Sequence, residues 1–375
     1  MKNALIVAET NPLHYGHVYL MDQAKKSGYR IIILMSASFT QRGLPVVTDP
    51  FTRANDLVKN GGDVVLTLPT QIATSYGEMF SHGAMTIAER FGTIDAVFCG
   101  TEWGDKDLYE QIYDYEEKPV FSKHLKESLD RGKSFSESYL TALEKENTQW
   151  KGLFQSNALL AYGYFKALKK INSSIEFYPV TRLKTSNRPL VSASYIRKHY
   201  DESAEELKKA CAGTPPKFSE GRLLESLYPL YRSLILNDSR DWSIYNGYEK
   251  GIDDRILRSL GEYDFFEDFL ENTKTRRYSR WRISRLLFHR FLNMTSEDIQ
   301  ESIKNQSAFY VLAFSEQGRF FLKDMKSTDV ILFTNYKDVR KLSPQDQKFL
   351  SYEENAMDLW SILTQSPTKR LFIGR

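Results

Sequence analysis

Two histidines and a glycine stand close together near the start of the chain. His14, Gly16 and His17 belong to the stretch Thr-Asn-Pro-Leu-His-Tyr-Gly-His at residues 10–17. In a helical turn, side chains three residues apart face the same side, and each imidazole can donate a hydrogen bond to charge that develops on a phosphoryl oxygen. Gly16 has no Cβ, so a phosphate can approach the backbone closely. A chance pairing is the alternative, but only six histidines occur in the whole chain.

Strands and helices alternate around this loop. Helical patterns separate short apolar runs, which indicates βαβ units with right-handed crossovers and a doubly wound parallel sheet of the α/β class. In such a sheet ligands bind beyond the carboxyl ends of the strands, and a helix N-terminus attracts phosphate. The histidine loop directly follows the first of these runs. The predicted strands are residues 4–8, 31–36, 63–68 and 95–99.

Three domains are predicted along the chain. Residues 1–200 carry the sheet, with a mostly helical stretch at 108–170 and one more strand at 175–182. Helical spacing and many aromatic residues predict an α-helical domain over residues 201–304. Residues 305–375 show a strand–helix–strand pattern, which predicts a small α/β appendage packed on the rest.

Composition limits the classes of protein to which the chain can belong. With 41% hydrophobic and 26% charged residues, it is a folded globular protein rather than a disordered one. The 51 Lys and Arg against 48 Asp and Glu leave a net charge of +3, which argues weakly against a dedicated nucleic-acid binder, although an average can hide a basic patch. The two cysteines, Cys99 and Cys211, form no metal-binding pattern. Without a signal peptide or a membrane helix, a cytoplasmic location and no membrane partner are expected.

Small hydroxyl residues and an arginine occur together at the start of a later helix. The stretch Val-Ser-Ala-Ser-Tyr-Ile-Arg at residues 191–197 follows a polar segment at 184–189. Ser192, Ser194 and Arg197 suit the negatively charged tail of a triphosphate. A Ser-Ala-Ser helix cap without any ligand is the alternative.

The histidine loop resembles the HxGH motif of the nucleotidyltransferase superfamily, which is related to class I aminoacyl-tRNA synthetases and has a Rossmann-like, HUP-type fold. The later stretch resembles the ISSTxIR-type phosphate loop of the same superfamily. There, the two histidines and the glycine bind ATP and stabilise transfer at its α-phosphate. The resemblance implies that His14 and His17 are catalytic, and that Ser192, Ser194 and Arg197 hold the triphosphate.

Further segments are similar, in order and along nearly the whole chain, to one family, the bacterial tRNA(Met) cytidine acetate ligases. The resemblance implies that ATP and acetate form acetyl-adenylate and that the acetyl group passes to the wobble cytidine of elongator tRNA(Met). Magnesium is expected on the phosphates of ATP, whereas no side-chain metal site and no protein partner are implied. The similar segments are residues 35–43, 62–69, 98–102, 156–160 and 275–280.

The resemblance also implies which residues surround ATP. Gly100, at the end of the fourth strand, would line the adenosine pocket, where the close approach of a ligand calls for glycine. Asn157 matches a polar contact of the family, although it could simply cap the helix that follows. Arg182 lies at the carboxyl end of a strand, the usual ligand edge. The N-terminal part of the implied site is Val7, Ala8, Glu9, Thr10, Asn11, Pro12, Leu13, His14, Tyr15, Gly16, His17, Val18, Tyr19 and Leu20.

Three segments depart from the family pattern. Where the family has Pro-Asn-Asn, this chain has Gln-Ser-Asn at residues 155–157. The family's Glu-Tyr-Asn-Pro-Phe-His-Asn-Gly-His is Glu-Thr-Asn-Pro-Leu-His-Tyr-Gly-His at residues 9–17, and its Gly-Asn-Phe is Ala-Ser-Phe at residues 37–39. Since both histidines and Gly16 are kept, we expect ATP use to be intact. The changes bear on carboxylate specificity and on rate.

Seven basic residues with no intervening acid follow an acidic stretch at residues 262–271. Tyr278 and Trp281 are interleaved with them, and the spacing is helical from about Ser279, so several arginines share a face. Arginine binds phosphate oxygens bidentately and aromatic rings stack on unpaired bases, which predicts contact with tRNA. The alternative is a solvated helix face whose arginines pair with the nearby acids. The predicted contacts are Lys274, Arg276, Arg277, Arg280, Arg282 and Arg285, and Arg290 completes the basic stretch.

Two other functions fit the same residues. A nucleotidyltransferase that adenylylates a small metabolite would make a dinucleotide and would have no use for the basic helix. A catalytically silent RNA-binding protein would keep the fold and would lose nothing when His14 or His17 is replaced. No general base for an attack by the cytidine amine is evident from the sequence.

Overall fold

A seven-stranded sheet forms the centre of the computed structural model, which describes residues 1–154, 156–182, 192–200 and 204–366. The strand order is β5-β4-β1-β2-β3-β6-β7. The first five strands in the chain all run parallel to one another, as the alternating pattern predicted. The strands are β1 (Lys2–Ala8), β2 (Tyr29–Ser36), β3 (Val64–Leu68), β4 (Ala96–Thr101), β5 (Glu176–Thr181), β6 (Ala308–Phe314) and β7 (Ile331–Phe333).

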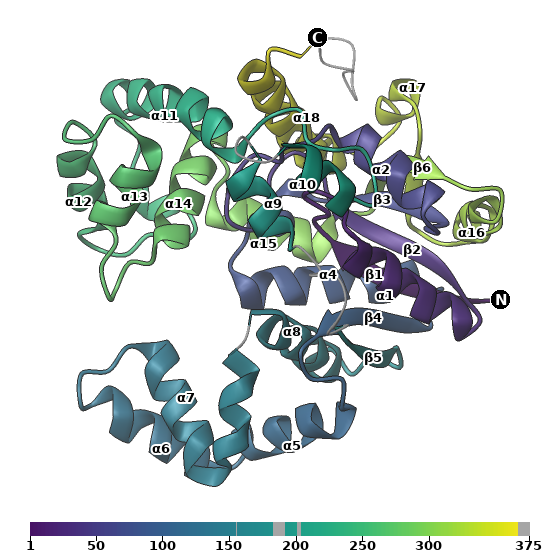
Figure 1. The fold of residues 1–375 in the computed structure, drawn as a ribbon, viewed down its shortest axis with the longest axis horizontal. Coiled ribbons are helices and arrows are strands. Elements are labelled where there is room, and N and C mark those ends of the chain that lie inside the picture. The colour runs from purple at the N-terminus through teal and green to yellow at the C-terminus, as the bar shows by residue number, and fades with distance from the viewer. Residues whose placement is uncertain (155, 183–191, 201–203, 367–375) are drawn as a thin grey trace.

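Helices cover both faces of the parallel strands (Figure 1). Alternate residues of one strand enter different cores, since Ile32 and Leu34 of β2 belong to one buried cluster and Ile33 to the other. All eight residues of β2 are buried, which is why its sequence is a nearly unbroken apolar run. The predicted doubly wound α/β class is therefore confirmed. The first core is covered by α3 (Thr70–Ala73), α4 (Gly77–Phe91) and α8 (Ser156–Lys170), and the second by α1 (Tyr15–Lys26) and α2 (Pro50–Lys59).

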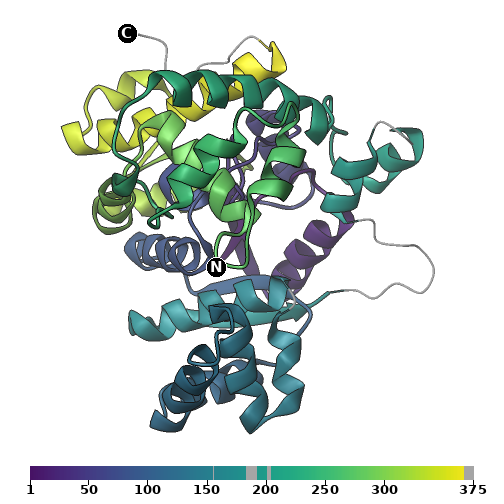
Figure 2. The ribbon, with the colours of Figure 1, turned by 90° about the vertical axis from the view of Figure 1, so that its left-hand side faces the viewer.

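A helical segment is inserted between β4 and β5 and extends away from the sheet at the bottom of Figure 1. Its core is aromatic: the ring of Tyr115 lies 5.6 Å from that of Phe121 and 5.5 Å from that of Trp150. Figure 2 shows this segment and the C-terminal helix at opposite ends of the molecule. The inserted helices are α5 (Lys106–Glu116), α6 (Pro119–Leu129), α7 (Phe135–Glu146) and the 3-10 helix η1 (Thr148–Phe154).

Between β5 and β6 the described residues, 192–200 and 204–307, form helices and no strand, as predicted for this part of the sequence. The helices α11 to α14 gather beside the sheet (Figure 1), around a core that includes Tyr228, Phe266 and Leu287. The elements are α9 (Ala193–His199), α10 (Ala204–Ala210), α11 (Glu220–Asn237), the 3-10 helix η2 (Trp242–Ile244), α12 (Ile252–Ser259), α13 (Phe266–Thr273), α14 (Arg280–Leu292) and α15 (Ser296–Asn305).

The strands of the predicted C-terminal α/β region extend the main sheet. β6 runs antiparallel to β3, and β7 lies parallel to β6 at the edge. The reason is that β3 offers an open edge and β6 is buried along its first five residues. The last helix packs back on the fold, where Nε1 of Trp360 donates to the carbonyl of Val46 (2.7 Å). The remaining elements are α16 (Gly318–Asp324), η3 (Met325–Ser327), α17 (Tyr336–Val339) and α18 (Pro344–Thr364).

The expected domain boundaries, at residues 200 and 304, stay predictions. The hydrogen bonds between β3 and β6 join the first and the last of the three predicted domains into one sheet. Within the described part of the chain, none of the helices combines the length and the apolar character needed to cross a lipid bilayer.

Candidate active site

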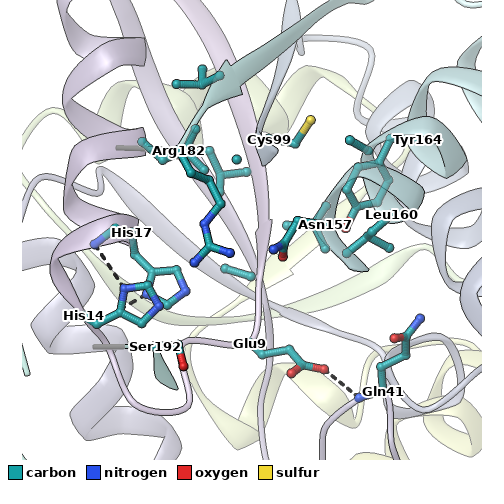
Figure 3. Close-up of a pocket in the computed structure, with 18 of the residues that line it drawn as sticks. Glu9, His14, His17, Gln41, Cys99, Asn157, Leu160, Tyr164, Arg182 and Ser192 are labelled. Atoms are coloured by element: carbon teal, nitrogen blue, oxygen red, sulfur yellow. Dashed lines mark hydrogen bonds between the residues drawn. The ribbon is translucent and has the colours of Figure 1, made fainter. Parts of the chain in front are cut away.

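A cavity of about 430 Å³ opens at the carboxyl ends of β1 and β4 (Figure 3). It lies where this fold class predicts a ligand, next to the N-terminus of α1. Most of the residues predicted for the ATP site meet here, although they come from distant parts of the sequence. The predicted residues that line the cavity are Val7, Ala8, Glu9, His14, Gly16, His17, Tyr19, Leu20, Gly100, Asn157, Arg182, Ser192 and Arg197.

The two imidazoles are held by the first turn of α1. Nδ1 of His14 accepts a hydrogen bond from the backbone N–H of Gly16 (3.0 Å), and Nδ1 of His17 accepts one from the backbone N–H of His14 (3.3 Å). Together they form a capping box, a role that Ser or Thr and Glu usually fill. Because both Nδ1 atoms accept, the proton of each neutral ring is on Nε2. Nε2–H is thus left for the cavity, which both rings line (Figure 3).

Burial keeps both rings uncharged. It lowers the pKa of His14 to about 4, and the guanidinium groups of Arg182 and Arg197 add to the shift. Burial also lowers the pKa of His17 well below its usual value, helped by His14 and Arg182. The ring centroids are 4.0 Å apart, so two imidazolium ions would repel each other. At neutral pH the pair therefore presents two uncharged N–H donors, as stabilisation of a developing oxyanion requires.

Gly16 is required by the position of His14. A Cβ at residue 16 would lie 2.8 Å from Cε1 and 3.0 Å from Nδ1 of His14. Side-chain atoms in proteins do not approach this closely, so any larger residue would displace the imidazole from its hydrogen bond with the backbone. The expectation that Gly16 admits a phosphate stays a prediction, and the packing of His14 is a second reason for glycine at this position.

The buried part of the histidine loop fixes its shape and does not line the cavity. Oδ1 of Asn11 accepts the backbone N–H of Val47 (2.8 Å), and the carbonyl of Leu13 accepts the backbone N–H of Ala212 (3.0 Å). Thr10 has a φ of 42°, a left-handed conformation that is unfavourable for a β-branched residue. The predicted ATP contacts that do not line the cavity are Thr10, Asn11, Pro12, Leu13, Tyr15, Val18 and Ser194.

Glu102 organises the wall of the cavity opposite the histidines. Its carboxylate accepts hydrogen bonds from Nδ2 of Asn157 (2.7 Å) and from the backbone N–H of Ala158 (2.8 Å), and it forms an ion pair with Arg182 (3.6 Å). Glu102 therefore accepts a backbone N–H of the first turn of α8, so the side chain of Asn157 does not cap this helix. The sequence pointed to the segment that contains Glu102 but assigned this residue no role.

The structure of the stretch from Ser192 to Arg197 agrees with both interpretations, a helix cap and a contribution to the site. Oγ of Ser192 accepts the backbone N–H of Tyr195 (3.2 Å) and caps α9, while Ser192 also lines the cavity. Ser194 is exposed and does not line the cavity. Arg197 lines the cavity but bonds to Glu220 (2.8 Å) and to the carbonyl of Asn11 (2.5 Å). The polar segment at 184–189, Val191 and Gln155 lie outside the described residues.

Several cavity residues were missed by the sequence reasoning. Gln41 and Arg42 follow the carboxyl end of β2, a ligand edge that could have identified them. Phe80 comes from the first turn of α4 and Tyr164 from the middle of α8, and no local signal marks them. Cys99 is both a buried strand residue, as expected, and part of the cavity wall, and burial raises the pKa of its thiol. The further lining residues are Ile6, Leu160, Ala161 and Val180.

Acidic side chains of residues 262–271 form ion pairs with part of the basic stretch, as the alternative interpretation of a solvated helix face predicted. Arg280 forms ion pairs with Glu271 (2.7 Å) and with Glu267, and Lys274 pairs with Glu271. These side chains are partly exposed, so the pairs contribute little to stability and can exchange for phosphate oxygens. Contact of Lys274 and Arg280 with tRNA stays a prediction.

Other members of the basic stretch differ in their surroundings. Arg277 and Arg282 share Glu249, with Nη1 of Arg282 at 2.8 Å from Oε2. Arg276 is exposed and has no ion pair with any residue in the described ranges. Their contact with RNA also stays a prediction. Arg276 is the basic side chain here that is most available to a ligand.

Arg290 is a structural residue and is not on the surface. Only 1% of it is exposed, its guanidinium lies 4.1 Å from the ring of Trp242, and Nη2 lies 3.1 Å from Asp238. It faces the interior because its helix, α14, buries the side that also carries Leu286. The basic stretch therefore contributes at most six residues to a nucleic-acid surface.

Helix α14 reaches the edge of the cavity. The ring of Trp281 contacts two guanidinium groups, that of Arg280 at 4.3 Å and that of Arg42, which lines the cavity, at 4.6 Å. Nη1 of Arg285 also lies 3.4 Å from the carbonyl oxygen of Gln41. Burial lowers the pKa of Arg285 to about 10, which leaves it charged at neutral pH. The predicted RNA-binding helix and the cavity wall are thus in direct contact.

Comparison with known proteins agrees with this geometry. The model of the HIGH Nucleotidyl Transferase family matches residues 1–372. A Clostridium perfringens protein named tRNA(Met) cytidine acetate ligase is 30% identical over 392 residues, which cover 96% of this chain and 95% of that protein. A protein of the same name from Caldanaerobacter subterraneus subsp. tengcongensis is 31% identical over 383 residues, which cover 95% and 94%. The crystal structure of Thermotoga maritima TmcAL bound with alpha-thio ATP matches with a TM-score of 0.85 and 26% identity, over 99% of this chain and 98% of that one.

These matches extend over nearly the full length of the chain. They include the histidine loop, the helical region with the basic stretch and the C-terminal strands that complete the sheet. The chain therefore belongs to the HIGH nucleotidyl transferase family and, within it, to the tRNA(Met) cytidine acetate ligases.

Proposed function

We propose that this chain is an ATP-dependent ligase that forms acetyl-adenylate from ATP and acetate and transfers the acetyl group to the wobble cytidine of elongator tRNA(Met). The observation that carries the proposal is the pair of uncharged Nε2–H donors, on His14 and His17, at the edge of a cavity that can hold a nucleotide. The names of the relatives support the tRNA substrate, and the ATP analogue bound to the Thermotoga maritima protein supports the nucleotide.

In the first step a carboxylate oxygen of acetate attacks the α-phosphorus of ATP in line with the departing pyrophosphate. Charge develops on the phosphoryl oxygens, and the Nε2–H groups of His14 and His17 donate hydrogen bonds to them. The guanidinium of Arg197 and the hydroxyl of Ser192 line the same cavity and hold the pyrophosphate, and the positive end of the α1 dipole favours its charge. Gly100, Asn157 and Arg182 enclose the nucleoside end.

Magnesium would enter with ATP. No group of three or more metal-ligating side chains occurs in the described ranges, and Glu9 is the sole carboxylate on the described cavity wall. The described residues thus offer no side-chain cage for the ion, and magnesium prefers phosphate oxygens and water as ligands. Its contribution would be to neutralise charge on the phosphates.

In the second step the exocyclic amine of the cytidine attacks the acetyl carbonyl of the adenylate. The base must leave the anticodon stack to reach the cavity. The contact between Trp281 on α14 and Arg42 on the cavity wall supports an approach of the tRNA along this helix. This reaction takes place where tRNA is, so we also propose a cytoplasmic location.

The test is incubation of the purified protein with ATP, labelled acetate and elongator tRNA(Met). We expect label in the tRNA that depends strictly on ATP, and none in a tRNA whose wobble cytidine is replaced by uridine. A variant with both His14→Ala and His17→Ala should label at least a thousandfold more slowly, while it still binds tRNA. A dinucleotide product in place of labelled tRNA would instead support adenylylation of a metabolite, and an unaffected double variant would indicate a silent RNA-binding protein.

A further inference from the structure

Glu9 is the one acidic side chain among the described residues that line the cavity, and the adenylate-forming step gives its carboxylate no role. It follows the end of β1, where Arg53 holds its main-chain carbonyl (2.5 Å). One carboxylate oxygen, Oε1, accepts the backbone N–H of Gln41 at 2.7 Å. Oε2 has no hydrogen-bond partner within the described ranges, and the carboxylate faces the cavity between Gln41 and the histidines (Figure 3).

A carboxylate is out of place beside the first pair of substrates. ATP and acetate are both anions, so a negative charge on the wall of their cavity weakens their binding. The other ionisable groups on the described wall are the two uncharged histidines, Cys99, Tyr19, Tyr164 and three arginines. The free oxygen of Glu9 suits a ligand that donates a hydrogen bond. Adenine and ribose also carry donors, but the proposed function places the nucleoside of ATP beside Gly100, Asn157 and Arg182, so the amine of the cytidine is the donor that we assign to Glu9.

The Watson–Crick edge of cytosine has a matching arrangement of donors and acceptors. Its exocyclic N4 amine donates and pairs well with a carboxylate, whereas uracil would place an acceptor oxygen at the same point. The neighbouring Arg42 offers guanidinium donors for the acceptor atoms N3 and O2. Arg42 forms no ion pair with a described residue and stacks on Trp281 at 4.6 Å. Glu9 and Arg42 therefore form the edge of the cavity that faces the predicted RNA-binding helix.

We propose that Glu9 is the catalytic base of the acetyl transfer: its free carboxylate oxygen accepts a hydrogen bond from N4 of the target cytidine and takes up a proton from it. The inference rests on the proposed function. The N4 lone pair forms a bond to the acetyl carbonyl carbon, and the bond between that carbon and the phosphate oxygen breaks, so AMP leaves with the electron pair. N4 loses one proton to Glu9, which passes it to solvent. The bond from Gln41 keeps the carboxylate oriented.

The test separates the two steps in the substitution Glu9→Gln, which keeps the hydrogen bond from Gln41 but cannot take up a proton. Adenylate formation is measured without tRNA as acetate-dependent exchange of labelled pyrophosphate into ATP, and transfer is measured as acetylcytidine in tRNA. We expect the ratio of the transfer rate to the exchange rate to fall by about 100-fold or more, the usual contribution of a general base. Glu9→Asp, which retains a carboxylate, should recover part of the loss.

Glu102→Gln is the matched control, because Glu102 is also an acid beside the cavity but bonds to Asn157 and Arg182 on the nucleotide side. It should slow exchange and leave the ratio of the two rates within threefold of the wild-type ratio.

Two results would overturn the assignment of Glu9. If Glu9→Gln leaves the ratio of the transfer rate to the exchange rate unchanged while the wild-type protein is active, Glu9 is not the catalytic base, but the proposed ligase function stands. A loss of exchange equal to the loss of transfer indicates a role in ATP or metal binding instead. If the wild-type protein acetylates no tRNA, the proposed function fails, and this inference fails with it.

Discussion

The imidazole of His14 occupies the space that a side chain at residue 16 would need, with Cε1 2.8 Å from the position of a Cβ on Gly16. The same ring accepts the backbone N–H of Gly16 at 3.0 Å. With the ring in this position, a Cβ on residue 16 would clash with the imidazole that accepts the hydrogen bond. The glycine of the HxGH motif is thus coupled to the histidine by packing as well as by its openness to phosphate.

We therefore predict that Gly16→Ala displaces His14 and slows adenylate formation by about 100-fold, the effect of losing one donor to the transition state. Pyrophosphate exchange measures this rate. The matched control is Gly221→Ala in the first turn of α11, where a Cβ meets no other atom within 4 Å. It should leave exchange unchanged and stabilise the protein by roughly 0.5–1 kcal/mol. Equal exchange rates in wild type and Gly16→Ala would show that the ring tolerates the methyl group.

Adenylate formation should not lose activity between pH 8 and pH 6 through protonation of the histidines. The pKa of His14 is lowered to about 4, and that of His17 is lowered as well, so both rings stay uncharged over this range. Two exposed histidines would titrate near 6.5 and would lose their role as neutral donors at pH 6. The rate of exchange at saturating ATP and acetate, measured against pH, distinguishes these cases. A fall of activity centred near pH 6.5 that disappears in His14→Asn would contradict the prediction.

The stability of the fold should decrease in acid because of His289. This buried residue of α14 contacts Oγ1 of Thr74 through Nε2 (3.0 Å), and burial lowers its pKa to about 3. The unfolded chain takes up a proton near pH 6.5 and the folded chain does not, so the stabilisation is complete above 6.5 and is lost as the pH falls from 6.5 towards 3. At pH 5 the expected loss is about 2 kcal/mol.

Urea denaturation of wild type and His289→Gln at pH 7.5 and pH 5 measures this contribution. The wild-type free energy of unfolding should fall more steeply between the two values than that of the variant. Parallel changes in the two proteins would assign the acid sensitivity to other groups.

The combined substitution of Arg276, Arg277 and Arg280 by alanine should weaken tRNA binding. The slope of log Kd against log salt should fall by about two, because fewer counterions are released from the RNA. Pyrophosphate exchange without tRNA should remain near the wild-type rate, since none of the three residues lines the cavity.

A triple alanine substitution of Lys118, Lys123 and Lys126 removes the same charge from exposed positions of the inserted helical segment. It is the control for this prediction. If both triple variants reduce tRNA affinity equally in a filter-binding titration, the basic stretch has no special role.

Much of the site could be predicted because its signals are local. A cap, a capping box and a strand of apolar residues depend on neighbours within a few positions, so the sequence around His14 and His17 specified the turn that holds them. Gly100, Asn157 and Arg182 were found through family resemblance, and the structure brings all three to one cavity. What the sequence could not provide was the partner of each residue, such as Glu102 for Asn157.

The sequence by itself determined the class of the fold, the histidine loop and the family. Only the tertiary structure decided that β6 completes the sheet against β3, that Arg290 is buried, and that Glu249 neutralises Arg277 and Arg282. It also placed Gln41 beside Glu9. The physical reason is that strand edges and ion pairs join segments far apart in the chain, and their pairing depends on how the elements pack, which no local pattern records.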